Sequence, residues 1–124
     1  MKDSEREPRK VLSEMAPVLS VLATRALYEE QPELWKLGER GRSRTVEDFH
    51  HHFMALRSLD AAVFRSHVQY CEALFAARGF PQKWLDDAWS WMAVVMEREL
   101  PETVAHPALA TLNEVVGTSR LTRQ

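Results

Sequence analysis

A chain of 124 residues has the length of a single domain, and its net charge of −2 gives no overall field that would attract nucleic acid or an anionic membrane. Hydrophobic residues make up 45% of the chain and charged residues 27%, which is ordinary for a globular protein. A single cysteine excludes an internal disulfide and a cysteine-rich zinc site. The N-terminus is charged, and the uncharged run over residues 15–24 is half of a bilayer span. We therefore expect a cytoplasmic protein with no membrane or nucleic-acid partner.

The first helix is expected over residues 13–30. Residues 1–10 have almost nothing to bury and are predicted to form a disordered tail, whereas apolar residues recur beyond them at alternating spacings of three and four. Pro17 sits inside this pattern, and because proline is tolerated only in a first helical turn, the helix should start near Ser13. Pro32 then opens a short helical segment.

The next helix, over residues 44–59, carries three consecutive histidines and follows a basic connector, residues 38–44, which we expect to be solvated. Since successive helical residues are 100° apart, the three rings must point in three directions. His52 falls inside the apolar arc, His50 lies on its rim and His51 faces water. The apolar stripe that defines this arc consists of Val46, Phe49, Phe53 and Leu56.

Capping signals delimit two further helices. Asp60 is a suitable N-cap for residues 61–78, and Gly79 is the glycine expected beyond their C-terminus. Residues 82–100 form the second of these helices, which has two adjoining apolar stripes and should be the most buried. Its polar face is expected to consist of Lys83, Asp87, Ser90 and Glu97.

A last helix is expected from Pro107 to Gly117, and residues 118–124 should fray. No segment shows sustained alternation of β-branched residues, so strands are not expected. Short connections favour antiparallel neighbours. The sequence thus predicts an all-α fold, in which residues 11–117 form a single-domain antiparallel bundle of five to six helices.

Four stretches, residues 28–52, 64–70, 78–81 and 99–101, have a spacing that resembles a helical domain of bacterial sensory and regulatory proteins, which often precedes a cobalamin-binding domain. From the first stretch to the last, the resemblance spans residues 28–101, about three-fifths of the chain. It implies a regulatory role rather than catalysis. The resemblance also implies that three residues occupy positions of the family's pattern and form a polar ladder with a spacing of four residues: Arg44, Asp48 and His52. With no room for a cobalamin-binding module after residue 124, we expect this chain not to bind cobalamin in the same way.

His52 is the best candidate for a chemical centre. Together with Tyr70, Trp89 and Trp91 it could form an aromatic pocket for a haem or bilin, in which a histidine serves as axial or hydrogen-bonding group. The alternative is a structural histidine at the edge of the core, bonded to Asp48, to a backbone carbonyl or to Tyr70.

Neither a metal site nor an enzyme is expected. The Glu-x-x-His spacing of di-iron bundles occurs once, at residues 47–50, where such a site needs two copies. Residues 50–52 cannot converge on one zinc ion from consecutive helical positions, and His67 adds no ligand spacing. Cys71 lies on a core stripe, where a thiol is normally inert.

The function predicted from these features is that of a non-enzymatic sensory or regulatory domain acting through self-association or through a protein partner. The predicted helix over residues 82–100 carries three tryptophans within eight positions. They lie on two apolar stripes, and packing of the core needs only one of these stripes. The other stripe could pack against neighbouring helices, contact a second copy of the chain or enclose an apolar small molecule. The alternative function is a haem, bilin or other apolar-ligand sensor. A tetrapyrrole would be its cofactor, and no other cofactor is expected.

Overall fold

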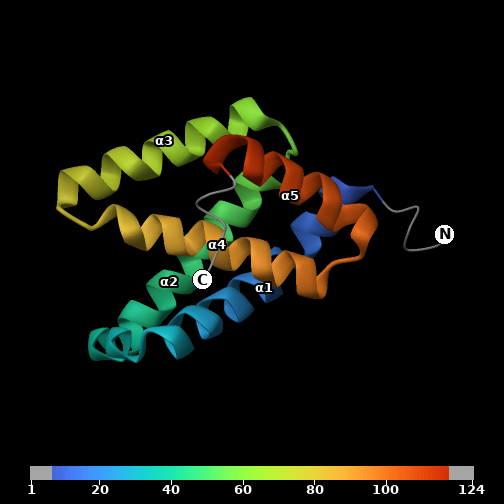
Figure 1. Cartoon of the computed structure of the whole chain (residues 1–124). Helices are drawn as coiled ribbons and strands as arrows, with labels where there is room; N and C mark the ends of the chain where they lie inside the picture. The colour runs from blue at the N-terminus through green and yellow to red at the C-terminus, as the bar shows by residue number, and fades with distance from the viewer. Residues whose placement is uncertain (1–6, 118–124) are drawn as a thin grey trace.

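The computed structural model describes residues 7–117, and every regular element in that range is a helix (Figure 1). The predicted all-α fold is therefore confirmed. Predictions for residues 1–6 and 118–124 lie outside the described residues. The elements are α1 (Pro8–Glu30), the 3₁₀ helix η2 (Pro32–Leu37), α2 (Gly38–Leu56), α3 (Ala61–Arg78), α4 (Gln82–Glu99) and α5 (Glu102–Val116).

All five α-helices contribute to one hydrophobic core. The helices α1 and α2 pack side by side along much of their length, and α4 lies against α1 and α5 (Figure 1). Burial of large apolar side chains supplies the main driving force for this packing, at about 1.5–3 kcal/mol each. The fully buried large side chains include Leu12, Leu19, Phe49, Phe53, Phe64, Leu85, Trp89, Met92 and Leu112.

Both ends of α3 agree with the capping residues predicted for them. The side chain of Asp60 accepts hydrogen bonds from the backbone N–H groups of Ala62 and Val63, at 2.8 and 3.3 Å. Gly79 has a φ of 70°, in the left-handed region that glycine adopts without steric cost, and its N–H closes the last turn. These caps fix where α3 begins and ends, and thereby position the side chains that it presents to α2.

The start of α1 was predicted wrongly. The helix begins at Pro8 rather than near Ser13, so residues 8–10 are helical although they were assigned to the tail. Pro8 occupies the first turn, and Pro17 lies in the interior of the helix on its exposed side. An interior proline costs about 3 kcal/mol. A helix that began only near Ser13 would leave out Leu12, which is fully buried, and would expose it.

The predicted connector over residues 38–44 is also helical, because α2 begins at Gly38. Gly41 lies within the first turns of α2, where the side chain of Leu37 packs directly over it. A Cβ atom at this position would clash with the Leu37 side chain. The glycine therefore permits the close turn from η2 into α2, and this turn forms part of the wall described below.

The last helix likewise begins earlier than predicted. It starts at Glu102, directly after Pro101, and Pro107 lies inside it. Val104 and Ala105, which belong to its first turns, are buried against the other helices. Their burial explains why tertiary packing extends the helix through a position at which proline would normally start one.

By length and composition, α1 could cross a membrane. Of the 18-residue window that meets this criterion, 44% is buried inside the molecule, and the core helix of a soluble protein passes the same test. The feature is weak evidence in either direction.

Candidate functional site

A cavity of about 700 Å³ lies between the C-terminal end of α1, η2, α2, α3 and the beginning of α4. Figure 1 shows η2 and the loop between α3 and α4 at the same end of the molecule, and the cavity lies between them. Its wall is mainly apolar. Leucine and aromatic side chains supply most of this wall, among them Leu27, Leu34, Leu74, Phe75 and Leu85.

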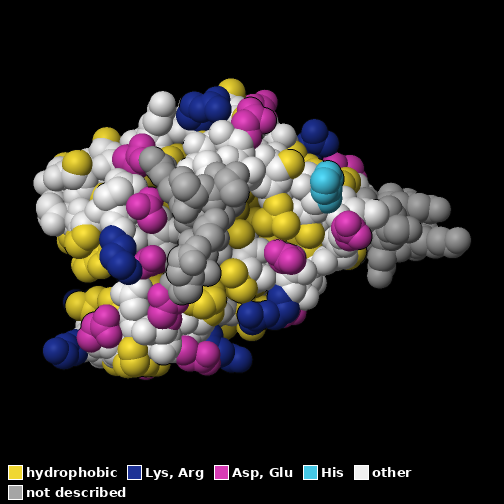
Figure 2. All heavy atoms as spheres, in the orientation of Figure 1, with side chains coloured by type: hydrophobic (Ala, Val, Ile, Leu, Met, Phe, Trp, Pro, Cys, Tyr) yellow, Lys and Arg dark blue, Asp and Glu magenta, His cyan; other side chains and the backbone are white. Residues whose placement is uncertain are grey.

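Four large side chains at the mouth of this cavity are exposed to solvent, and we call them the rim: Leu37, Tyr70, Phe80 and Trp84. Their exposed fractions range from 40% for Phe80 to 65% for Tyr70. The rings of Phe80 and Trp84 contact each other, with centroids 5.4 Å apart. Hydrophobic side chains are visible on the surface at this end of the molecule in Figure 2. The rim gives the cavity an apolar entrance.

His52 lies on the inner side of α2, as predicted, and is buried with 7% of its surface exposed. Its Nδ1 atom is 2.8 Å from Nε2 of His67 on α3, so one ring donates a hydrogen bond to the other. Its ring also packs against Trp89, with centroids 4.7 Å apart. Burial lowers the pKa of His52 to about 3, and the neighbouring charges of His67 and His51 act in the same direction. The ring is therefore neutral at physiological pH.

His67 and Cys71 stand one turn apart on the face of α3 that meets α2. The Sγ atom of Cys71 is 3.5 Å from Nε2 of His67, which is also the atom that faces His52. Burial raises the pKa of the Cys71 thiol to about 11, and the nearby carboxylates of Asp48 and Glu72 raise it further. Burial lowers the pKa of His67. The structure thus places two neutral imidazoles and a protonated thiol together at the cavity wall.

Of the contacts predicted for the polar ladder, only the one between Arg44 and Asp48 is present. Arg44 and Asp48 form an ion pair of 3.7 Å on the surface of α2. His52, the third member, makes its hydrogen bond to His67 rather than to Asp48 or Tyr70. Burial raises the pKa of Asp48, although Arg44 acts in the opposite direction. The interhelical bond is formed because the ring of His52 meets His67 on α3, whereas the half-buried Asp48 carboxylate pairs with Arg44.

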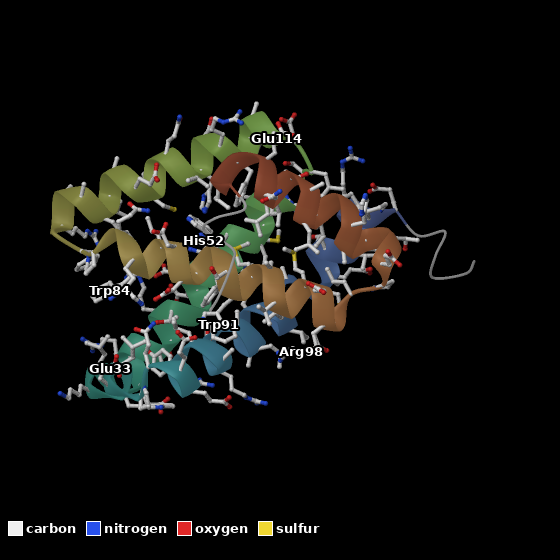
Figure 3. All side chains as sticks on the ribbon, viewed as in Figure 1. Glu33, His52, Trp84, Trp91, Arg98 and Glu114 are labelled. Atoms are coloured by element: carbon white, nitrogen blue, oxygen red, sulfur yellow. The ribbon has the colours of Figure 1, made fainter. Side chains whose placement is uncertain are left out.

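The four residues predicted for an aromatic pocket have different positions. His52 and Tyr70 line the cavity, and Trp89 supports His52 from behind as a fully buried ring. Trp91 does not line it, and in Figure 3 it lies away from His52, on the side of α4 nearer to α1. Trp84, one of the rim residues, is the tryptophan of α4 that reaches the cavity. The structure thus places His52 and Tyr70 at the cavity and leaves Trp89 and Trp91 out of its lining, and ligand binding by these four residues stays a prediction.

His67 and Cys71 were missed, and the judgement that His67 adds no ligand spacing is wrong. The ligating atoms of His52, His67 and Cys71 all lie within 4.8 Å of one another. A signal was present in the sequence, since the His-x-x-x-Cys spacing places both side chains on one face of α3. His52, the third residue of this cluster, could not be linked to the other two by sequence spacing, because it lies on another helix, α2.

The polar face predicted for α4 is also partly wrong. Asp87 and Ser90 are buried, with 8% and 2% exposed. The Asp87 carboxylate accepts a hydrogen bond of 2.8 Å from the side chain of Gln31 at the end of α1, and it pairs with Lys83 at 2.7 Å. A buried carboxylate is stable here because it has these partners. The contact ties α4 to α1 beside the cavity.

Comparisons with known protein families, with curated proteins and with solved structures found no match. The resemblance to the helical domain that precedes cobalamin-binding domains therefore stays a prediction.

Proposed function

We propose that this chain is a non-enzymatic helical sensory or regulatory domain that binds a small, largely apolar ligand in the cavity between α1, η2, α2, α3 and α4. The observation that carries the proposal is the cavity itself. Its volume of about 700 Å³ falls within the range of about 300–1,000 Å³ that is typical of small-molecule sites. A mainly apolar wall with a few converging polar groups is the usual composition of such sites.

The polar groups indicate what kind of ligand would fit. His52 and His67 are neutral, so they can donate or accept a hydrogen bond but do not supply a positive charge. The Tyr70 side chain stands at the entrance. The charged side chains on the wall, among them Arg44, Asp48, Arg78 and Asp87, are of both signs. Together, these features favour a molecule without net charge that has an apolar body and a hydroxyl or carbonyl group. A haem or bilin would be larger and would carry carboxylate groups, and the Nδ1 atom of His52 is already engaged by His67.

The same groups are poorly suited to catalysis. A thiol whose pKa is about 11 is protonated at neutral pH and is a weak nucleophile. An imidazole whose pKa is about 3 is a poor general base, because it holds a proton only weakly. This chemistry supports a binding role.

Binding can be tested with the uncharged fluorescent probe N-phenyl-1-naphthylamine. We expect saturable fluorescence enhancement with wild-type protein and at least tenfold weaker binding with Leu74→Trp, which fills space at the cavity wall. Leu109→Trp is the matched control, because Leu109 is partly buried in the core on α5 and does not line the cavity. Absence of saturable binding, or an equal loss in both variants, would contradict the proposal. A parallel haemin titration, followed by visible absorption, tests the tetrapyrrole alternative.

A second candidate function is self-association through the rim. Four large exposed side chains around one opening are a surface that a second copy of the chain could cover. The second apolar stripe of α4, which the sequence suggested for this role, is largely used by the core, since Ala88 and Val95 are buried. Trp84, at the rim, is the member of that stripe that is free to contact a partner surface.

A further inference from the structure

We propose that His52, His67 and Cys71 form a binding site for one Zn²⁺ ion. Each offers one ligating atom, and these atoms lie within 4.8 Å of one another where α2 meets α3. Two imidazole nitrogens and one thiolate sulfur are a donor set that zinc commonly takes in proteins. The inference goes beyond the proposed function, because metal binding does not depend on an organic ligand in the cavity.

The separation of the His67 and Cys71 donor atoms fits tetrahedral coordination, whereas the position of His52 must adjust. Zinc binds nitrogen at about 2.0–2.1 Å and sulfur at about 2.3 Å, so tetrahedral geometry separates two nitrogens by about 3.4 Å and a nitrogen from a sulfur by about 3.6 Å. Nε2 of His67 and Sγ of Cys71 are 3.5 Å apart. Nδ1 of His52 and Nε2 of His67 are 2.8 Å apart and must separate by about half an ångström, since an ion would replace their shared hydrogen.

The protonation states of the ligands define the reaction. Zinc coordinates the neutral form of an imidazole ring through a nitrogen lone pair. The two rings must present lone pairs from Nδ1 of His52 and Nε2 of His67, so the shared hydrogen moves to the opposite nitrogen of its ring. The thiol of Cys71 releases its proton to solvent as the zinc–sulfur bond forms. Binding of one ion therefore releases one proton, with no change in oxidation state.

Three protein ligands leave the fourth position of a tetrahedral zinc ion open. His52, His67 and Cys71 all line the cavity, so this position is accessible from it. Water, or the polar group of a bound molecule, can complete the coordination. Sites with three protein ligands and one exchangeable ligand are typical of zinc that contacts small molecules, whereas structural zinc is usually enclosed by four protein ligands.

The test uses the full-length chain without a histidine tag, made metal-free by dialysis against a chelator. Co²⁺ serves as the spectroscopic probe for Zn²⁺, because a cobalt–thiolate bond gives a charge-transfer band and tetrahedral Co²⁺ absorbs in the visible region. We expect both signals to saturate at one equivalent, to disappear when Zn²⁺ is added, and to be accompanied by the release of one proton per Zn²⁺ ion in weakly buffered solution.

Variants identify the ligands. Cys71→Ser should abolish the charge-transfer band, and Cys71→Ser and His67→Gln should each weaken Zn²⁺ binding at least about tenfold, the lower bound seen when metal sites are disturbed. His106→Gln is the matched control, because this exposed histidine on α5 does not line the cavity and its loss should leave wild-type affinity. Circular dichroism verifies that each variant is folded, and Cys71→Ala serves if the serine variant is not.

Two results would overturn the proposal: Co²⁺ binding without a thiolate band in the wild type, or unchanged Zn²⁺ affinity in a folded variant at position 71. Loss of fluorescent-probe binding in Leu74→Trp, with Zn²⁺ binding retained, would show that the two sites are separable. A failure of the ligand-binding proposal is thereby distinguished from a failure of the metal-binding one.

Discussion

The imidazole rings of His52 on α2 and His67 on α3 share a hydrogen bond of 2.8 Å between Nδ1 and Nε2. The bond joins residues 15 positions apart in the chain and lies at the wall of the cavity. Each ring is also in contact with the aromatic core, His52 with Trp89 and His67 with Phe64. The pair is thus both a structural link between two helices and the polar part of an otherwise apolar site.

Replacing either histidine should destabilise the metal-free protein. We expect His52→Gln and His67→Gln each to lower the free energy of unfolding by about 1–2 kcal/mol, the usual cost of disturbing a buried polar contact. The double variant should lose less than the sum of the two, because both changes remove the same bond. Urea denaturation in the presence of a chelator measures the four values. Strict additivity would show that the bond contributes nothing.

The stability of the metal-free protein should depend on pH through His52. Its pKa is lowered from 6.5 to about 3 in the folded protein, so below pH 6.5 the unfolded chain takes up a proton that the folded protein does not. The free energy of unfolding should therefore fall as the pH decreases from about 6.5 toward about 3. His51 and His67 reinforce this trend through their positive charges. The dependence should be shallower in His52→Gln, and parallel curves for the two proteins would contradict the assignment.

Adjacent positions on α2 should differ sharply in their tolerance of alanine. Phe53 is fully buried, and Phe53→Ala should cost about 3–5 kcal/mol because it leaves a cavity in the core. His51 is exposed, and His51→Ala should change the free energy of unfolding by less than about 0.5 kcal/mol. Chemical denaturation of both variants provides the comparison. Losses of similar size would mean that the inner side of α2 has been assigned wrongly.

The hydrogen bond between Gln31 and Asp87 should contribute more to the free energy of unfolding than the ion pair between Asp87 and Lys83. Gln31→Ala should cost about 1.5–3 kcal/mol, because it removes a hydrogen bond to the buried, charged Asp87 carboxylate. Lys83→Ala should cost less than about 1 kcal/mol, since the lysine side chain is 70% exposed. Thermal or urea unfolding can rank the two variants. A larger loss for Lys83→Ala would place the stabilising contact in the ion pair instead.

Self-association through the rim predicts a change in mass with concentration. Light scattering should detect a dimer at micromolar concentration, and Trp84→Glu should yield a folded monomer, because a charge is unfavourable in an apolar interface. Trp84 is preferable to Trp91 for this experiment, since Trp91 is half-buried and its replacement by a charged residue would also disturb the core. A monomer mass at every concentration would remove this candidate function.

The sequence by itself determined which sides of the helices face inward. Helical periodicity placed His52 toward the core and His51 toward water, and the structure confirms both. Local chemistry determined the ends of α3, because Asp60 and Gly79 act through hydrogen bonds within a few residues. These features depend only on neighbouring positions in the chain.

Tertiary structure decided where α1 and α5 begin. Pro17 and Pro107 indicated helix starts, yet both lie inside helices, because the turns that precede them bury Leu12 and Val104 completely. Tertiary packing overrides the preference of proline for a helix start, because burial of a large apolar side chain contributes an energy similar to the cost of an interior proline.

Tertiary structure also decided the chemistry of the site. Periodicity shows that a polar side chain faces inward but not what it meets, because that depends on the angle and offset at which two helices pack. Thus His52 bonds to His67 rather than to a neighbour on its own helix, and Asp87 is buried against Gln31 instead of facing solvent. Cys71 joins the histidines for the same reason: its spacing from His67 is local, but its distance from His52 is set by the packing of α3 against α2.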